Sequence, residues 1–148
     1  MKKEAYRDYA TEAFRTWAAW GRPSYDDAVE RIRAGAIKRA GSIDPAKVIA
    51  FADAEVERRS ALLCDMLACE KCFELLSEQK KCVSEAVMEI YMSEPNRNLR
   101  RNEITCRVLR FAIEHSVSER LVYNWLKEAR DLFAGLRGLR IDDGEQIL

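Results

Sequence analysis

Four polar side chains near the C-terminus recur at the spacing of one helix face: Arg120, Tyr123, Asn124 and Lys127. Side chains three, four and seven residues apart lie on the same side of an α-helix, so these groups are expected to point in one direction. Guanidinium, amide and ammonium groups are the donors with which proteins read base edges and hold phosphates. The pattern therefore indicates a nucleic-acid-binding surface, in which Arg120 pairs with guanine and Asn124 with adenine.

The residues around this face have the spacing of a helix-turn-helix. Ala112 is small, as the crossing point of two packed helices requires, and residues 116–118 form a short turn. Val122 and Trp125 then return to the core from a second helix, and Val117 with Val122 occupies the two positions of a hydrophobic staple. A helix held at a fixed angle in this way has the shape needed to enter a major groove. An antiparallel helix pair without a ligand shares the same apolar spacing and is the simpler alternative.

The charge distribution agrees with a nucleic-acid ligand. The 148 residues carry 25 basic and 25 acidic side chains, yet residues 95–140 hold ten Lys or Arg against five acids. A basic C-terminal half beside an acidic N-terminal half points weakly to a polyanion as the partner of the C-terminal half. Solvated charged faces would explain the same numbers without a ligand. Phosphate contacts are expected from Lys127 and from four arginines: Arg97, Arg100, Arg101 and Arg130.

Other chemistry has little support in the sequence. His115 is the only histidine, and no serine or cysteine is arranged with it as a nucleophile. The five cysteines (64, 69, 72, 82 and 106) include a Cys69-x-x-Cys72 pair, but this pair lies within an expected helix and nothing completes four zinc ligands. Glycine-rich phosphate loops are absent as well. We therefore expect no enzyme activity, no metal site and no cofactor, with the cysteines as buried structural thiols.

An all-α fold is expected around these residues. Only three prolines and six glycines interrupt a chain that is 48% hydrophobic and 34% charged. Apolar residues repeat at helical spacing, and helix starts are expected at Ser24, Asp44-Pro45, Ser77, Asn102 and Ser118. These signals predict about six helices, long ones followed by a C-terminal three-helix unit, at residues 4–20, 24–40, 45–77, 77–92, 102–115 and 118–137.

Two of these helices have consequences for packing. The helix at 45–77 would form a rod of roughly 50 Å at about 1.5 Å per residue. Such a rod is too long for a small globule, so it either bends near Cys69–Cys72 or packs partly against another subunit. The helix at 102–115 has a second apolar side with Leu109 and Ile113, and is expected to be buried over more than half its girth.

Three regions follow from this order of elements. Residues 1–76 form an N-terminal helical region for support or oligomerisation, residues 77–140 a helix-turn-helix DNA-binding domain, and residues 141–148 an acidic tail. No run of eighteen apolar residues and no signal-peptide core occurs, and the number of cysteines is odd. These features favour a cytoplasmic protein with reduced thiols and no membrane contact.

The chain also contains a set of longer motifs: Asp65-Met-Leu-Ala68, Val87-x-x-Ile90-Tyr91, Val117-Ser-Glu-Arg-x-Val-Tyr-x-Trp-Leu126, Ala129-Arg-x-Leu-Phe-Ala134 and Arg137-Gly-Leu139. Together they resemble prophage-encoded transcriptional regulators of the RinA and ArpU type. Those proteins are similar to the promoter-binding fourth region of sigma factors, with long helices ahead of a C-terminal helix-turn-helix. The resemblance covers about residues 60–140.

This resemblance implies promoter DNA as ligand, control of phage genes and a contact with host RNA polymerase. Carried over residue by residue, it marks as recognition positions Ser118, Glu119, Arg120, Tyr123, Asn124 and Lys127. Two positions depart from the usual motif. Ser116 stands where glycine eases the turn, and His115 stands where an aliphatic residue is common, so the angle of approach to DNA depends on the geometry of this turn.

The sequence thus favours sequence-specific binding of double-stranded DNA by a phage-type transcriptional regulator. Single modules of this kind bind weakly, so a homo-oligomer or a polymerase partner is expected. Two alternatives stay open: a terminase small subunit for DNA packaging, and a helical protein-interaction adaptor that does not bind DNA.

Overall fold

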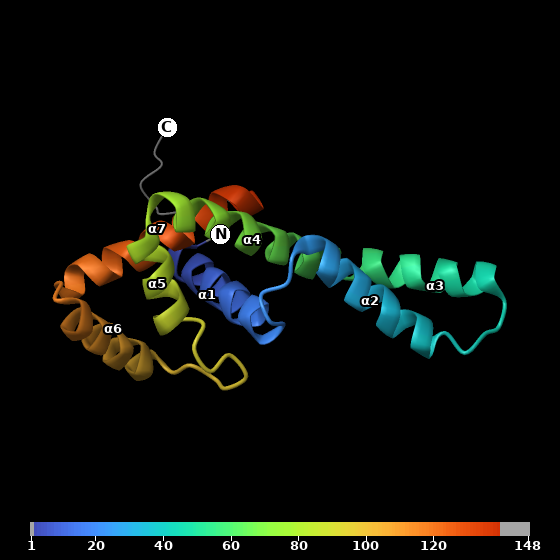
Figure 1. The fold of residues 1–148 in the computed structure, drawn as a ribbon, viewed down its shortest axis with the longest axis horizontal. Helices are drawn as coiled ribbons and strands as arrows, with labels where there is room; N and C mark the ends of the chain where they lie inside the picture. Colours follow the sequence, from blue (N-terminus) through green and yellow to red (C-terminus); the bar gives the residue numbers. More distant parts are fainter. Residues whose placement is uncertain (1, 140–148) are drawn as a thin grey trace.

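The structure, a computed structural model, describes residues 2–139 and contains seven α-helices within that range (Figure 1). Their bounds are α1 Lys3–Ala19, α2 Tyr25–Arg39, α3 Pro45–Arg58, α4 Ser60–Gln79, α5 Lys81–Ile90, α6 Arg101–His115 and α7 Glu119–Arg137. The predicted all-α fold is confirmed, with one helix more than expected. No helix in the described range is both long and apolar enough to cross a membrane. The expected acidic tail, residues 141–148, lies outside the described residues.

Several expected helix starts are present as hydrogen-bonded caps. The side chains of Ser24 and Asp44 accept hydrogen bonds from backbone N–H groups at 3.2 and 3.1 Å, and Pro45 opens α3 as expected. Ser77 and Asn102 are not caps. Helix α4 continues past Ser77 to Gln79 because the buried Leu76 keeps its last turns in the core, and α6 begins one residue earlier than expected.

The expected single helix over residues 45–77 is divided at Arg59 and is not bent near Cys69–Cys72. Arg59 has φ −102° and ψ 23°, which interrupts the helix between α3 and α4. Cys69 and Cys72 lie on the buried side of an unbroken α4, each at 0% exposure. The interruption falls where the chain passes from a projecting pair of helices into the main core, which α4 first enters at Leu63 (Figure 1).

Helix α7 is the central element of a body formed by α1, α4, α5, α6 and α7 (Figure 1). The Phe133 ring of α7 lies 5.5 Å from the Phe14 ring of α1, which meets Phe73 of α4 edge to face at 5.9 Å. Aromatic rings at such separations attract one another and bury large apolar areas. A single core therefore joins helices from both sides of residue 76. The functional division expected at that residue stays a prediction.

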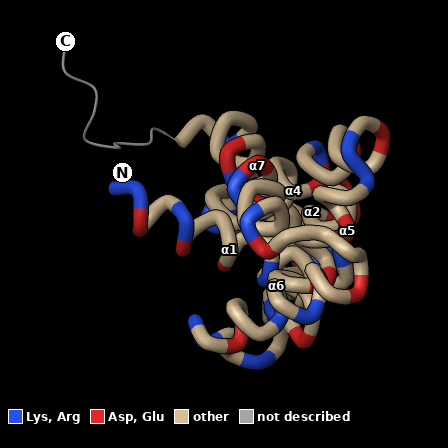
Figure 2. Tube along the Cα trace, turned by 90° about the vertical axis from the view of Figure 1, so that its left-hand side faces the viewer, with Lys and Arg blue, Asp and Glu red and all other residues tan. Residues whose placement is uncertain are grey.

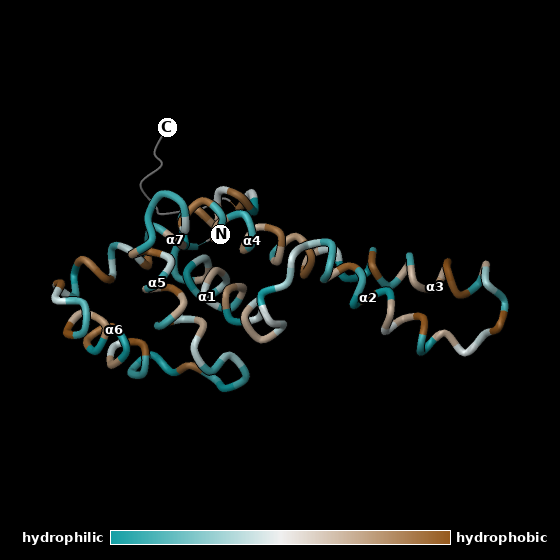
Figure 3. The backbone as a smooth tube through the Cα atoms, viewed as in Figure 1, coloured by the Kyte–Doolittle hydropathy of each residue, from teal (hydrophilic) through white to brown (hydrophobic). Residues whose placement is uncertain are grey.

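Helices α2 and α3 form a hairpin, residues 25–58, that we call the arm. It projects from the body in Figure 1, and Figure 3 shows apolar stretches towards its far end. Helix α2 buries Ala28, Ile32 and Ala36, whereas α3 buries only Ala52. An ion pair of 2.7 Å between Arg33 and Asp53 joins the two helices. The arm is thus a two-helix layer with most of its surface uncovered.

Candidate nucleic-acid interface

A tight left-handed turn joins α6 to α7. Ser116 has φ 55° and ψ 44°, the conformation that glycine adopts most easily. The N–H of Val117 donates to the carbonyl oxygen of Ala112 at 3.0 Å, and the N–H of Ser116 donates to that of Ile113 at 3.3 Å. These two hydrogen bonds form the Schellman motif, which commonly ends a helix at glycine. Ser116 therefore makes the turn that the motif requires, with local backbone strain.

The first turn of α7 is fixed by a cap and an apolar contact. The hydroxyl of Ser118 accepts a hydrogen bond from the N–H of Leu121 at 3.1 Å, which confirms the expected N-cap. Val117 is partly buried against the core and Val122 is 0% exposed, as expected for a hydrophobic staple. Helix α7 therefore leaves the turn in one defined direction.

Helix α6 packs against α5 and α7 through one side only. Phe111 is buried and meets Trp125 of α7 edge to face, with ring centroids 6.3 Å apart, and His115 stacks on Phe111 at 3.9 Å. The expectation that α6 is buried over most of its girth is wrong. Leu109 is 45% exposed and Ile113 is 70% exposed, because no other helix among the described residues covers that side.

Three of the expected base contacts form an exposed stripe on α7: Arg120, Asn124 and Lys127. Their spacing of four and three residues keeps them on one side of the helix, away from the fully buried Val122 and Leu126. Two further expected contacts, Ser118 and Glu119, are exposed at the start of the same helix. The donors of the stripe are thus held on a rigid helix and face away from the core.

Lys127 forms an ion pair within α7. Its Nζ donates to Asp131 at 2.7 Å, and Asp131 also accepts a hydrogen bond from the hydroxyl of Tyr6 in α1 at 2.5 Å. Burial acts to raise the pKa of Asp131, but the hydrogen bonds from Lys127 and Tyr6 outweigh it and hold that pKa below its usual value. The carboxylate stays charged at neutral pH, so Lys127 is partly neutralised and Arg120 is the stronger anchor for an anion.

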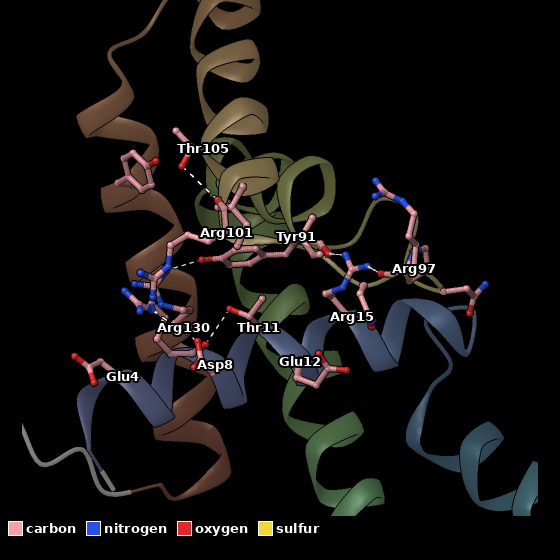
Figure 4. Close-up of a pocket in the computed structure, with 17 residues that line it drawn as sticks. Glu4, Asp8, Thr11, Glu12, Arg15, Tyr91, Arg97, Arg101, Thr105 and Arg130 are labelled. Atoms are coloured by element: carbon pink, nitrogen blue, oxygen red, sulfur yellow. Dashed lines mark hydrogen bonds and ion pairs between the residues drawn. The ribbon is translucent and has the colours of Figure 1, made fainter.

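Tyr123, the sixth expected base contact, lies at one edge of the same face of α7, beside Arg120 and Lys127. It is 40% exposed and lines a groove of about 880 Å³ (Figure 4). The wall of this groove formed by α1 carries three acidic side chains, Glu4, Asp8 and Glu12, and two basic ones, Arg7 and Arg15. Tyr123 therefore lies between the exposed stripe and a groove of mixed charge.

Arg130 is placed differently from the exposed phosphate contact expected for it. Its guanidinium enters the same groove and donates to the hydroxyl of Tyr91 at 2.6 Å (Figure 4). The Nε of Arg130 is buried and has no hydrogen-bond partner among the described residues. A guanidinium held in this way connects α7 to the end of α5 and has little freedom to follow a DNA backbone.

The segment between α5 and α6, residues 91–100, brings the other expected phosphate contacts to a helix N-terminus. Arg100 and Arg101 are exposed at the start of α6, where unpaired backbone N–H groups attract anions. Arg97 is exposed as well, but it pairs with Glu94 at 2.9 Å and with Glu103 at 2.8 Å. Two carboxylates therefore compete with any anion for Arg97, whereas Arg100 and Arg101 have no ion-pair partner within 4.0 Å among the described residues.

Two buried arginines hold this segment, and no sequence motif indicated them. Arg15 of α1 is 4% exposed and donates to the backbone carbonyls of Tyr91 at 2.5 Å, Glu94 at 2.8 Å and Arg97 (Figure 4). Burial, and after it the charge of Arg107, lowers the pKa of Arg15. A guanidinium has five donors in a rigid fork, which suits several carbonyls of one loop.

The second buried arginine, Arg107 of α6, is 5% exposed and donates to the carbonyls of Ile90 at 2.9 Å and Ser93 at 3.1 Å. One signal for it exists in the sequence: Arg107 precedes the core residue Phe111 by four positions and so lies on the buried side of its helix. Arg15 and Arg107 are positioning residues, since they fix the backbone that presents the exposed arginines.

One group of described side chains brings three possible metal ligands together, two carboxylates and an imidazole. Ligand atoms of Glu89, Glu114 and His115 lie within 4.8 Å of one another. Burial, and after it the hydrogen bond with Glu114, raises the pKa of Glu89. Two of the three residues are exposed and only three ligands are available, so the group is a surface cluster with no built metal site.

The Cys-x-x-Cys pair is part of the core. Burial raises the pKa of both thiols, to about 12 for Cys72, so both are protonated at neutral pH. Protonated, fully buried thiols are poor nucleophiles and poor metal ligands. The expectation of buried structural thiols holds for this pair, whereas Cys64, Cys82 and Cys106 are exposed.

Basic and acidic residues are interspersed along the helices. Figure 2 shows Lys and Arg next to Asp and Glu along the chain trace. Among the expected contact residues, the exposed positive charges without an ion-pair partner in the described chain are Arg100, Arg101 and Arg120. Comparisons of the chain with protein-family models, with curated proteins and with solved structures gave no match.

Proposed function

We propose that this protein binds double-stranded DNA in a sequence-specific manner and acts as a phage-type transcriptional regulator. The observation that carries the proposal is the exposed stripe of Arg120 and Asn124 on α7. That helix is fixed by the left-handed turn at Ser116 and the cap at Ser118. Arg and Asn are the side chains that make bidentate contacts to guanine and adenine in the major groove.

The placement of the other charges suits such a contact. We expect the N-terminal half of α7 to enter the major groove. A phosphate that flanks the contacted bases would then lie near Arg100 and Arg101. Lys127, already paired with Asp131, adds a weaker contact.

The proposal is tested by selecting sites from random duplex DNA with the full chain, followed by binding measurements on the selected sequence. Replacement of Arg120 and Asn124 by alanine should reduce affinity for the selected site by about 1–3 kcal/mol for each bidentate contact. Affinity for unrelated DNA should fall by less, because only the charge of Arg120 contributes to general attraction whereas both base contacts supply specificity.

A matched pair of arginine variants separates phosphate contacts from base contacts. Arg100→Ala and Arg101→Ala should weaken binding to all sequences alike and lower the slope of log K against log salt by about 1 each. Lys71→Ala, an exposed position on α4 far along the chain from the stripe, is the control and should leave both properties unchanged.

Selection of the same site by the variant that lacks both Arg120 and Asn124 would contradict the proposed base contacts.

A second candidate is a helical adaptor that contacts protein through α6. It is favoured by one observation, the exposed pair Leu109 and Ile113 on the outer side of that helix. An adaptor predicts no salt-dependent binding to duplex DNA, so the titration against random duplex at several salt concentrations distinguishes the two functions.

A further inference from the structure

The arm carries uncovered apolar side chains that the proposed DNA contact does not use. Ile37 is 53% exposed, Ile49 is 59% exposed, and Ile43 in the connecting loop is 101% exposed. All three lie towards the far end of the arm, away from the body (Figures 1 and 3). Exposed apolar side chains gathered on one projecting element commonly mark a surface for a protein partner.

Helix α2 also carries a self-complementary charge pattern on its outer side. Glu30, Ala34 and Lys38 follow one another at intervals of four residues, and all three are exposed. They lie on one stripe of the helix, across from the buried Ala28 and Ile32. Within the described chain, neither Glu30 nor Lys38 has an ion-pair partner within 4.0 Å.

From these observations we infer that the arm is a dimerisation surface, and that its partner is a second copy of this chain. The two α2 helices lie antiparallel, with Ala34 of each copy at the two-fold axis. Glu30 of one copy then faces Lys38 of the other on both sides of the axis. A two-fold axis requires such a pattern, because the same surface must be complementary to itself.

The same pairing covers part of the apolar surface. Ile37 lies three residues after Ala34 and borders the stripe, so the antiparallel pairing covers part of this exposed side chain. Alanine at the crossing point lets two helices approach to the usual 8–10 Å.

The size of the contact predicts a weak, concentration-dependent dimer. Helix α2 has 15 residues, which at about 1.5 Å each gives a contact roughly 22 Å long. One helix pair of that length falls at the low end of specific interfaces, where complexes are transient. A dissociation constant in the micromolar range is expected. This inference does not depend on DNA binding, since no residue of the stripe on α7 takes part.

Sedimentation equilibrium of the full chain from about 1 to about 300 µM tests the inference. The apparent mass should rise from that of the 17.1 kDa monomer towards twice that value. Ala34→Arg, which adds bulk and charge at the axis, should weaken the dimer about 100-fold or more. Ala50→Arg is the matched control, an exposed alanine on α3 of the same arm, and should leave the mass profile unchanged. A protein that stays monomeric throughout, or equal dimerisation of the Ala34→Arg variant, would overturn the inference.

A charge exchange tests the antiparallel arrangement and involves only exposed positions. Glu30→Lys places lysine opposite Lys38, and Lys38→Glu places glutamate opposite Glu30, so each variant alone should dimerise about tenfold more weakly. A mixture of the two variants restores opposite charges at both contacts, as does the double variant, and both should recover the original dimer. Failure of the mixture and of the double variant to recover would rule out the pairing, whatever the outcome of DNA binding.

Discussion

Helix α7 and helix α3 have similar proportions of apolar residues but very different surroundings. Helix α7 packs against α1, α4, α5 and α6, and its inner residues, Val122 and Phe133 among them, are fully buried. Helix α3 packs mainly against α2 and buries only Ala52, while Ile49 and Phe51 stay exposed. Whether an apolar residue is buried in the core or left on the surface therefore depends on how many neighbouring elements surround it. Its hydropathy alone does not determine this.

The largest expected difference between the two regions is in the stability cost of removing a phenylalanine. Phe133→Ala removes a ring that is 0% exposed and touches Phe14, and should lower the free energy of unfolding by about 3–5 kcal/mol. Phe51→Ala removes a ring that is 41% exposed and should cost less than about 1 kcal/mol. Denaturant unfolding of both variants measures this difference. Equal losses of unfolding free energy in the two variants would show that Phe51 contributes as much to packing as Phe133.

Hydrogen exchange should report the same contrast in the unmodified protein. Backbone amides of α7 between residues 122 and 133 should exchange only on global unfolding, whereas those of α3 should exchange about 100-fold faster or more, through local opening of the arm. The measurement belongs at low micromolar concentration, where the proposed dimer dissociates. Protection of α3 equal to that of α7 under these conditions would show that the arm unfolds together with the body.

Trp125 allows a second comparison within α7, between a partly buried and a fully buried aromatic residue. This indole is partly buried and contacts Phe111 edge to face, unlike the fully buried Phe133. Trp125→Ala should therefore cost about 2 kcal/mol, less than a core aromatic residue. A melting temperature that falls as far as in the Phe133 variant would mean that the first half of α7 is packed as tightly as the second.

The smallest expected effect is at the turn between α6 and α7. Ser116→Gly removes a side chain from a left-handed position and should stabilise the protein by about 0.5–1 kcal/mol. Gly138, which ends α7 at φ 77° with the same pair of hydrogen bonds, is the matched control, and Gly138→Ser should cost a similar amount. Thermal melts of both variants measure the two effects, and a destabilised Ser116→Gly protein would show that the serine side chain has a contact of its own.

Local signals in the sequence predicted the second half of the candidate site well. Ser118 caps α7, Val122 is buried, and Arg120 and Asn124 are exposed, because these properties depend on helical periodicity and on hydrogen bonds within a few residues. The turn at Ser116 was also expected from its position in the motif, although serine is not the usual residue there.

Features that depend on tertiary packing were not predictable in the same way. The periodicity of α6 shows that Leu109 and Ile113 share a side, but whether another helix covers that side depends on the path of the whole chain. Arg15 is a charged residue in the interior, and its partners are backbone carbonyls about eighty positions away in sequence, which composition does not encode. The sequence predicts Arg130 as a phosphate contact, whereas its guanidinium is held by the hydroxyl of Tyr91.

The link from Arg15 to the segment before α6 has a practical consequence for protein engineering. A fragment starting near Lys81 would keep the two motif helices but lose the guanidinium that holds their leading segment, together with the α1 and α4 surfaces that cover Phe133. Grafting those two helices alone onto another protein should give an aggregation-prone chimera. A useful transplant has to include the N-terminal helix.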